Sequence, residues 1–261
     1  MSTLDQKHRN DIEKVMGRLD SSFFFYDLDL LANHLGGMRD ILDPSIKLWY
    51  ACKANPMSAI LKIFRNLDFG IDVASQGELD QVLRAGIKPN EIISTGPSKS
   101  RKYLKSLIKN EIKVVVCESI NQVYWLNEIA KQLDIRPEVL LRVQLDWESG
   151  SSVLGGDAIT PFGIGPQDWQ ELDLTKTNYL KIIGLHAFQW GNILDLKELE
   201  NIWNETIIKL KRLSSDINIP LKVLDLGGGI GIPYADDDSK PVNFKDIHKI
   251  LIKLKEAYNL D

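Results

Sequence analysis

Short runs of β-branched and other apolar residues alternate along the chain with longer stretches whose apolar residues recur every three or four positions. The first pattern is typical of buried strands, and the second of helices that pack one face on a core. Seven runs are expected to be strands: Lys47 to Ala51, Phe69 to Ala74, Glu91 to Thr95, Lys113 to Cys117, Glu138 to Val143, Lys181 to Phe188 and Leu221 to Leu226. An extended piece is expected at Ser22 to Tyr26. The alternation predicts βα units around a parallel sheet.

Local signals support helices between these strands. Pro56 is expected at the first position of a helix, where its missing N–H costs nothing. Ser75 and Glu78 have the spacing of a capping box, and Gly86 stands where a helix end favours a left-handed residue. A last helix is expected around Phe244 to Tyr258, with no strand after it.

The chain of 261 residues has no Pro- or Ser-rich linker, so we expect a single domain. A (β/α)₈ barrel takes about 250 residues and eight βα units, whereas an open doubly wound sheet can have fewer strands. Seven strands fit neither arrangement fully. The pattern alone therefore leaves both open and indicates that a barrel would lack its last strand.

The composition argues against several classes of binding partner. The 32 basic and 36 acidic residues give a formal net charge of −4, so nucleic acid and anionic membranes are poor partners. Two cysteines can form neither a disulfide framework nor a cysteine-rich zinc site, and no metal is expected. The N-terminal residues lack the pattern of a signal peptide, which favours a cytoplasmic protein.

Lys53 stands directly after a predicted buried strand, where barrel enzymes carry their active sites. A lysine amine at such a place can form a Schiff base with an aldehyde carbon. The alternative is a lysine whose charged end reaches from the strand into solvent.

A glycine-rich turn follows the last predicted strand and contains Gly227, Gly228, Gly229 and Gly231. Without Cβ atoms, the backbone N–H groups of such a turn can approach a phosphate closely. The alternatives are a plain tight turn and the first motif of an S-adenosylmethionine-dependent methyltransferase. The second alternative leaves only about 30 residues for the rest of that domain.

Other polar residues stand at predicted strand ends. Asp72 lies near the end of one strand, and Arg142 and His186 lie at the ends of two others. An arginine at a buried strand end usually binds an anion or a hydroxyl oxygen. His186, between two apolar residues, also fits a packed core histidine.

Eight motifs occur in order between about residues 22 and 234. They are Phe25-Tyr26-Asp27, Tyr50-Ala51-Cys52-Lys53-Ala54-Asn55, Asp72-Val73-Ala74-Ser75, Gly96-Pro97-Ser98-Lys99, Leu141-Arg142-Val143, Phe162-Gly163, Gly184-Leu185-His186 and Asp225-Leu226-Gly227-Gly228-Gly229. In this order they resemble the fold-type III pyridoxal-phosphate decarboxylases, which include the ornithine, diaminopimelate and arginine decarboxylases. The resemblance implies a (β/α)₈ TIM-type barrel like that of alanine racemase, and the decarboxylation of an amino acid.

The resemblance also implies residue roles. Lys53 would hold pyridoxal 5'-phosphate as a Schiff base, and Gly227 to Gly229 would bind its phosphate. Arg142 would lie near the 3′-oxygen of the cofactor, and Asp72 and His186 would line its pocket. The cofactor would supply the electron sink and the protein its orientation.

Two positions depart from the family pattern. Phe188 stands where the family commonly has a histidine stacked on the cofactor ring, and its aromatic face could still stack. Gly191 stands where a phosphate-binding serine is usual, so its N–H could bind phosphate but no hydroxyl is available.

The family continues with a Glu-Pro-Gly-Arg strand, whose glutamate pairs with the pyridine nitrogen, and a β-domain that contributes to the partner subunit's site. Neither occurs within residues 1–261. We therefore expect an incomplete barrel domain that forms a homodimer or joins a complementing C-terminal chain. The expected substrate is an amino acid of the diaminopimelate or ornithine type, or one of secondary metabolism. The alternative is a pyridoxal-phosphate-binding barrel without catalysis, or half of a split enzyme.

Overall fold

The computed structural model describes residues 6–19, 21–147, 160–234 and 240–260. The strands in this part of the chain are β1 (Trp49–Ala51), β2 (Gly70–Val73), β3 (Ile92–Ser94), β4 (Val114–Cys117), β5 (Glu138–Arg142), β6 (Lys181–His186) and β7 (Val223–Asp225). The helices are α1 (Gln6–Met16), α2 (Leu28–Arg39), α3 (Ser58–Asn66), α4 (Gln76–Arg84), α5 (Arg101–Lys109), α6 (Ile120–Leu133), α7 (Pro166–Gln170), α8 (Leu196–Asp216) and α9 (Phe244–Tyr258). All seven strand predictions and the last helix are confirmed, with strands slightly shorter than expected.

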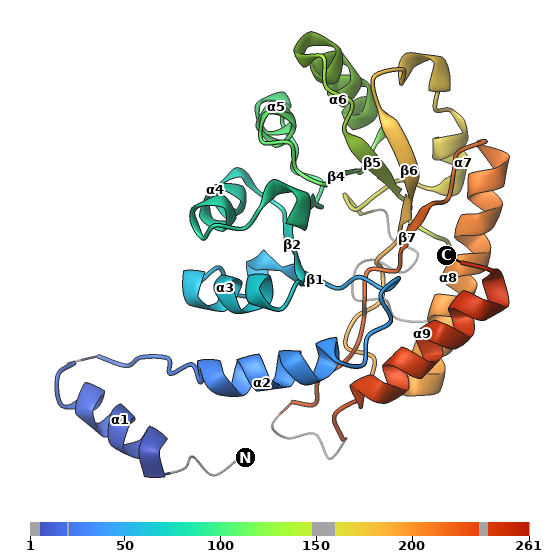
Figure 1. Ribbon diagram of the computed structural model, residues 1–261. Coiled ribbons are helices and arrows are strands. Elements are labelled where there is room, and N and C mark those ends of the chain that lie inside the picture. Colours follow the sequence, from blue (N-terminus) through green and yellow to red (C-terminus); the bar gives the residue numbers. More distant parts are fainter. Residues whose placement is uncertain (1–5, 20, 148–159, 235–239, 261) are drawn as a thin grey trace.

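The strands form one parallel sheet in sequence order, from β1 to β7. The sheet curls, with α3 to α6 outside it along β1 to β5 and with α8 and α9 beside β6 and β7 (Figure 1). In the described residues β1 and β7 are the two ends of the sheet and do not pair with each other. In the described residues the fold is a TIM-type barrel that stays open between β7 and β1, which confirms the expected fold class.

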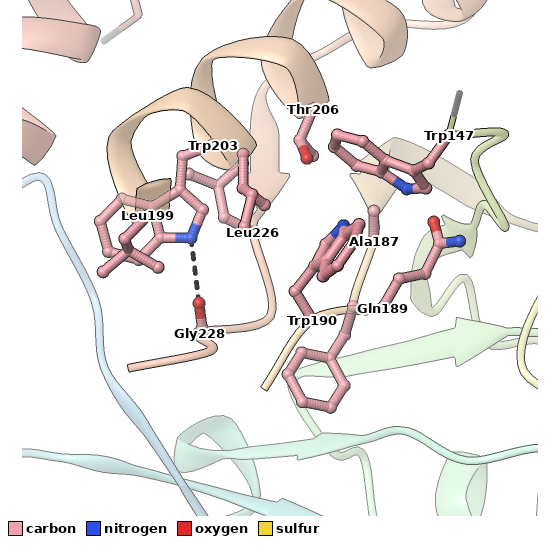
Figure 2. Close-up of a pocket in the computed structure, with 11 residues that line it drawn as sticks. Trp147, Ala187, Gln189, Trp190, Leu199, Trp203, Thr206, Leu226 and Gly228 are labelled. Carbon is pink, nitrogen blue, oxygen red and sulfur yellow. Dashed lines mark hydrogen bonds between the residues drawn. The ribbon is translucent and has the colours of Figure 1, made fainter. Parts of the chain in front are cut away.

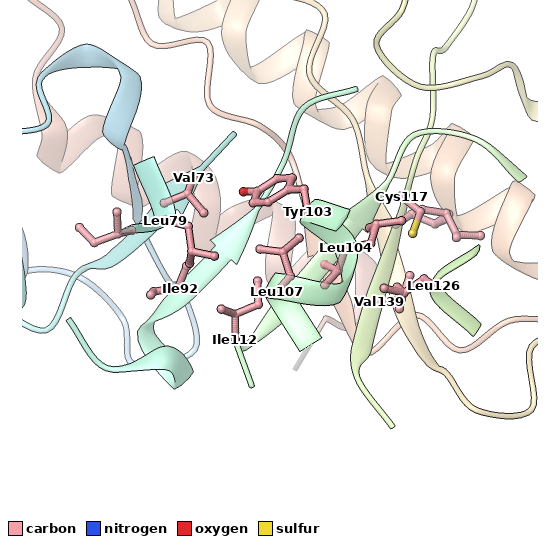
Figure 3. Packing of buried hydrophobic residues seen from close by; sticks show 14 of the residues in the cluster. Val73, Leu79, Ile92, Tyr103, Leu104, Leu107, Ile112, Cys117, Leu126 and Val139 are labelled. Atoms are coloured by element: carbon pink, nitrogen blue, oxygen red, sulfur yellow. The ribbon is translucent and has the colours of Figure 1, made fainter. Parts of the chain in front are cut away.

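The main core lies between the sheet and its outer helices, as Figure 3 shows. Helix α5 illustrates its origin, because its buried residues recur at helical spacing on one face: Tyr103, Leu104, Leu107 and Ile108. The strands supply the opposite side of this core with residues such as Val73, Ile92 and Val139. A second apolar cluster joins α8 to α9 through Trp203, Ile247 and neighbouring residues. This packing fixes the strands whose ends form the site.

The predicted capping box starts α4. Ser75 Oγ accepts a hydrogen bond from the N–H of Glu78 at 3.2 Å. The Glu78 carboxylate accepts in return from the N–H of Ala74 at 2.8 Å, one residue before the expected donor. Gly86 has a φ of +81°, as its place after the helix predicts.

The start of α3 differs from the prediction. The helix begins at Ser58 rather than at Pro56. Asn55 Oδ1 accepts from the N–H of Met57 at 3.0 Å, so a turn built on the asparagine side chain precedes the helix. Residues 22–26 belong to none of the strands in the described part of the chain, and Phe24 is 87% exposed. No helix among the described residues has the length and apolar character needed to span a membrane.

Candidate active site

Charged and polar residues occur at the carboxyl ends of all seven strands, which share one rim because the strands are parallel. In strand order they are Lys53, Asp72, Lys99, Glu118, Arg142, His186 and Asp225. The shared rim brings together the strand-end residues that the sequence analysis singled out separately. It also adds three residues that the analysis did not assign to the site, Lys99, Glu118 and Asp225.

Arg142 is buried at the end of β5, and its guanidinium is held from two sides. Its Nη1 lies 3.1 Å from Oε1 and 3.3 Å from Oε2 of Glu118, and its Nη2 donates to the carbonyl of Phe188 at 3.3 Å. The guanidinium lies 4.8 Å from the ring centroid of Phe162. The buried Nε has no hydrogen-bond partner within the described structure. Arg142 is thus a fixed cation with one unused donor, as an anion-binding arginine requires.

Lys99 follows β3 and is only 3% exposed. Its ammonium donates a hydrogen bond to the carbonyl of Gly96. Burial lowers the pKa of Lys99 to about 8, although the charges of Glu118 and Asp72 act in the opposite direction. A second positive charge therefore stands beside Arg142 at neutral pH.

Asp72 occupies β2 and faces the end of β3. Its carboxylate accepts from the hydroxyl of Thr95 at 2.8 Å and from the N–H of the same residue at 3.1 Å. Burial raises the pKa of Asp72 to about 6, and the nearby charge of Asp225 adds to the shift. Asp72 can therefore hold a proton close to neutral pH.

His186 ends β6 and pairs in register with Asp225 on β7. Burial lowers the pKa of His186, although the charge of Asp225 opposes the shift. The buried Nδ1 has no hydrogen-bond partner among the described residues. His186 is therefore a neutral imidazole with a ring nitrogen available inside the barrel.

The glycine loop after β7 needs its glycines for conformation and for space. Gly227, Gly228 and Gly229 have φ angles of +70°, +98° and +93°. A Cβ on Gly227 would lie 2.4 Å from Cβ of Phe188, whereas a Cβ on Gly228 would meet nothing within 4 Å. The N–H groups of Gly228 and Gly229 donate no hydrogen bond within the described part of the chain. The loop thus leaves two backbone donors without a partner among the described residues, with open space at Gly228, a combination that fits a phosphate.

Helix α8 supports this loop from behind. Trp203 Nε1 donates to the carbonyl of Gly228 at 2.9 Å, as the dashed line in Figure 2 shows. A cavity of about 10 Å³ lies beside the loop, between Trp147 and Trp190 on one side and Trp203 on the other. Its size suits a single water and no cofactor, so a phosphate would be bound on the open side of the loop.

Lys53 lies apart from the buried cluster. It belongs to a short 3-10 turn, Cys52–Ala54, directly after the edge strand β1, and its side chain is exposed. A cavity of about 370 Å³ begins next to it and includes Ala54 and Asn55 in its lining. The structure therefore places the lysine at the predicted rim but at the open end of the sheet.

Two further predicted residues lie in the segment after β6. Phe188 is half-buried and its Cβ is in close contact with the glycine loop at Gly227. Gly191 is half-buried three residues later, between β6 and α8. Phe188 therefore stands beside the glycine loop, and Gly191 follows it in the same connecting segment.

A βα sheet that carries a lysine, a fixed arginine and a glycine loop at one rim has the layout of a cofactor-binding barrel domain. Residues 28–260 match the family described as "Pyridoxal-dependent decarboxylase, pyridoxal binding domain". The chain belongs to this family.

Relatives of known function are similar at low identity. The L-glutamyl-acyl-carrier-protein decarboxylase of Niallia circulans, which acts with the carrier protein BtrI, is 27% identical over 86% of this chain and 53% of its own length. Diaminopimelate decarboxylase of Campylobacter jejuni is 25% identical over 94% of this chain and 62% of its own length. The crystal structure of diaminopimelate decarboxylase from Helicobacter pylori with L-lysine superposes with a TM-score of 0.81, at 25% identity, over 95% of this chain and 64% of that one. The chain thus spans less than two thirds of these relatives.

Proposed function

We propose that this chain binds pyridoxal 5'-phosphate through Lys53 and takes part in the decarboxylation of an amino acid. The observation that carries the proposal is the glycine loop, in which the N–H groups of Gly228 and Gly229 have no partner among the described residues. The loop lies at the rim where the strand before Lys53 also ends. Membership of a pyridoxal-binding family supports the same cofactor.

When bound, pyridoxal phosphate supplies an electron sink for the electron pair that remains as the carboxylate of an amino acid leaves as carbon dioxide. Lys53 would hold the cofactor through its amine, and the loop Gly227 to Gly229, with the N–H of Gly191, would bind the phosphate. Arg142, held by Glu118, would donate its free Nε to the 3′-oxygen. Each of these roles uses a group that the fold leaves accessible or unpartnered.

The remaining rim residues would define the pocket around the cofactor. Phe188 would offer an aromatic face to the ring. Asp72, with its pKa near 6, can hold or release a proton inside the pocket. His186 would contribute a neutral ring nitrogen, because burial disfavours its protonated form. These groups orient the ligand and limit the access of water.

The substrate in this proposal is an amino acid of the diaminopimelate or ornithine type, or one of secondary metabolism. Two relatives are named for diaminopimelate and for an L-glutamyl group on a carrier protein, respectively. We also propose that a second copy of this chain or a complementing C-terminal chain completes the site. The unpaired sheet edges at β1 and β7 in the described residues support this part of the proposal.

The first test is the visible absorption spectrum of the purified protein with pyridoxal phosphate, before and after borohydride reduction. We expect a cofactor band in the wild type and covalent attachment to Lys53 after reduction, located by peptide mass mapping. The Lys53→Ala variant should lose both. Lys62→Ala, which removes another exposed lysine nearby on α3, is the matched control and should keep both. Absence of attachment in the wild type would refute the proposal.

A non-catalytic pyridoxal-phosphate-binding barrel is the second candidate, and it is favoured by the sheet that stays open between β7 and β1 in the described residues. Carbon dioxide release from a panel of diamino and basic amino acids separates the two. Release by the wild type and not by Lys53→Ala would support the decarboxylase. Cofactor attachment without release from any substrate would support the carrier or a split enzyme.

A further inference from the structure

Lys99 is a buried lysine to which the proposed function gives no role. An ammonium group has three N–H donors, and in the described structure the carbonyl of Gly96 is the one acceptor that Lys99 reaches. No described carboxylate lies within ion-pair distance, 4.0 Å, of its Nζ. A buried charge without a close partner opposes folding. The burial of this ammonium group therefore does not stabilise the fold.

The titratable groups that act electrostatically on Lys99 belong to three strands. They are Glu118 and Cys117 at the end of β4, Asp72 on β2 and Arg142 at the end of β5, and the thiol of Cys117 is neutral at pH 7 because burial raises its pKa to about 12. Glu118 is already engaged by Arg142. At pH 7 the ammonium of Lys99 and the guanidinium of Arg142 balance the carboxylates of Glu118 and Asp72. Without the ammonium, this part of the rim would carry a net negative charge and would repel an anion.

A hydrogen-bond path fixes Lys99 relative to Glu118. Gln122 Nε2 donates to the carbonyl of Pro97 at 2.8 Å, within the turn that precedes Lys99. Gln122 Oε1 accepts from the N–H of Glu118 at 2.9 Å. The turn after β3 and the end of β4 are thereby held together, and the lysine keeps its place beside the glutamate and arginine pair.

We propose that Lys99 is a positioning residue for an anionic ligand: its ammonium offsets part of the carboxylate charge around Arg142, so that the free Nε of Arg142 can bind a negatively charged oxygen. This inference rests on the proposed function, in which that oxygen belongs to pyridoxal phosphate. The lysine then weakens the ligand-free fold and strengthens ligand binding. A lysine with a merely structural role would stabilise the ligand-free fold.

The test uses Lys99→Met, which removes the charge, and Lys99→Arg, which keeps it. Lys102→Met, at an exposed position on α5, is the matched control. The urea midpoint of each ligand-free protein is measured between pH 7 and pH 10.5, and the dissociation constant of pyridoxal phosphate at pH 7.

The informative quantity is the difference between the midpoints of the wild type and Lys99→Met, because the raised pKa values of Cys52, Cys117 and Tyr103 lower the stability of both proteins as the pH rises. The folded-state pKa of Lys99 lies near 8, below its ordinary value of 10.5, so the wild-type midpoint should rise relative to that of Lys99→Met between pH 8 and pH 10.5. Lys99→Met should also bind pyridoxal phosphate about tenfold more weakly at pH 7. Lys99→Arg should retain most of the affinity, and Lys102→Met should behave as the wild type in both measurements.

Three results would overturn the inference, and they are distinguishable. Unchanged affinity in Lys99→Met, with binding by the wild type, refutes the role of Lys99 and leaves the proposed function intact. Lower stability of ligand-free Lys99→Met over the whole pH range indicates a structural lysine and also refutes that role. Absence of pyridoxal phosphate binding by the wild type refutes the proposed function, and this inference with it.

Discussion

Arg142 and Glu118 form a buried ion pair at the rim, with the Nη1 and Oε1 atoms 3.1 Å apart and side chains that are 5% and 1% exposed. Removing one partner of such a pair leaves the other charge buried without compensation. We expect Glu118→Ala to lower the free energy of unfolding by about 3 to 5 kcal/mol at pH 7, measured by urea denaturation.

The matched control for this variant is Glu128→Ala. The Glu128 carboxylate binds Arg101 at 2.6 Å, but the two side chains are 54% and 53% exposed. Solvent screens this pair, so the loss should stay below about 1 kcal/mol. Equal losses in the two variants would contradict the importance that we give to the buried pair.

The glycine loop allows stability and ligand binding to be separated. In Gly227→Ala the new Cβ would lie 2.4 Å from Cβ of Phe188, so we expect a loss of about 3 kcal/mol in unfolding free energy. In Gly228→Ala the methyl group meets no atom within 4 Å, and only the positive φ disfavours it, by about 1 kcal/mol.

Gly228→Ala should weaken ligand binding although it costs little stability. The methyl group of Gly228→Ala would enter the open space beside the free N–H groups, so pyridoxal phosphate should bind at least about tenfold more weakly. Pyridoxal without its phosphate serves as the control ligand and should bind this variant and the wild type alike. An equal loss of affinity for both ligands would place the phosphate elsewhere.

Much of the fold could be predicted because its signals are local. Each strand is a short apolar run, and the start of α4 depends on Ser75 and Glu78, three residues apart. The predicted start of α3 was wrong by two residues, because the Asn55 side chain accepts a hydrogen bond from the N–H of Met57 and the turn continues past Pro56. Proline signals a helix start without fixing which residue begins it.

The site was harder to predict than the fold. The sequence allowed four residues at strand ends to be singled out: Lys53, Asp72, Arg142 and His186. Their functional roles stay predictions. Lys99 also follows a strand and stands in a motif of the family, yet a lysine after a strand is usually exposed. Only the curling of the sheet buries it against groups from β2, β4 and β5, and no local pattern in the sequence records that burial.

Asp72 should make stability depend on pH in the acidic range. Its folded-state pKa is about 6 against an ordinary value of 3.8, so the folded protein binds more protons between these values and loses stability as the pH rises through them. The expected loss from this group is about 3 kcal/mol. Urea denaturation from pH 3.5 to pH 7 should show this component in the wild type and not in Asp72→Asn.

Other carboxylates titrate in the same range, so the informative quantity is the difference between wild type and variant. Thr95→Val removes the hydroxyl donor to Asp72 and should increase the pH dependence, because that hydrogen bond lowers the pKa of Asp72. Parallel curves for wild type and Asp72→Asn would mean that the carboxyl group titrates normally.

The open edge of β7 should promote association. Val223 is 38% exposed on this strand, which has a strand neighbour, β6, on one side only in the described structure. An unprotected edge of this kind offers backbone N–H and C=O groups to a second copy or to a complementing chain. We expect the wild type to elute from size-exclusion chromatography as a species larger than a monomer. Val223→Lys should shift the elution toward the monomer, because a lysine on an edge strand disfavours pairing.

Ile208→Lys is the matched control, because Ile208 is 48% exposed but lies on α8 and not on the edge strand. A monomeric wild type, or an equal shift in both variants, would show that β7 does not carry the contact.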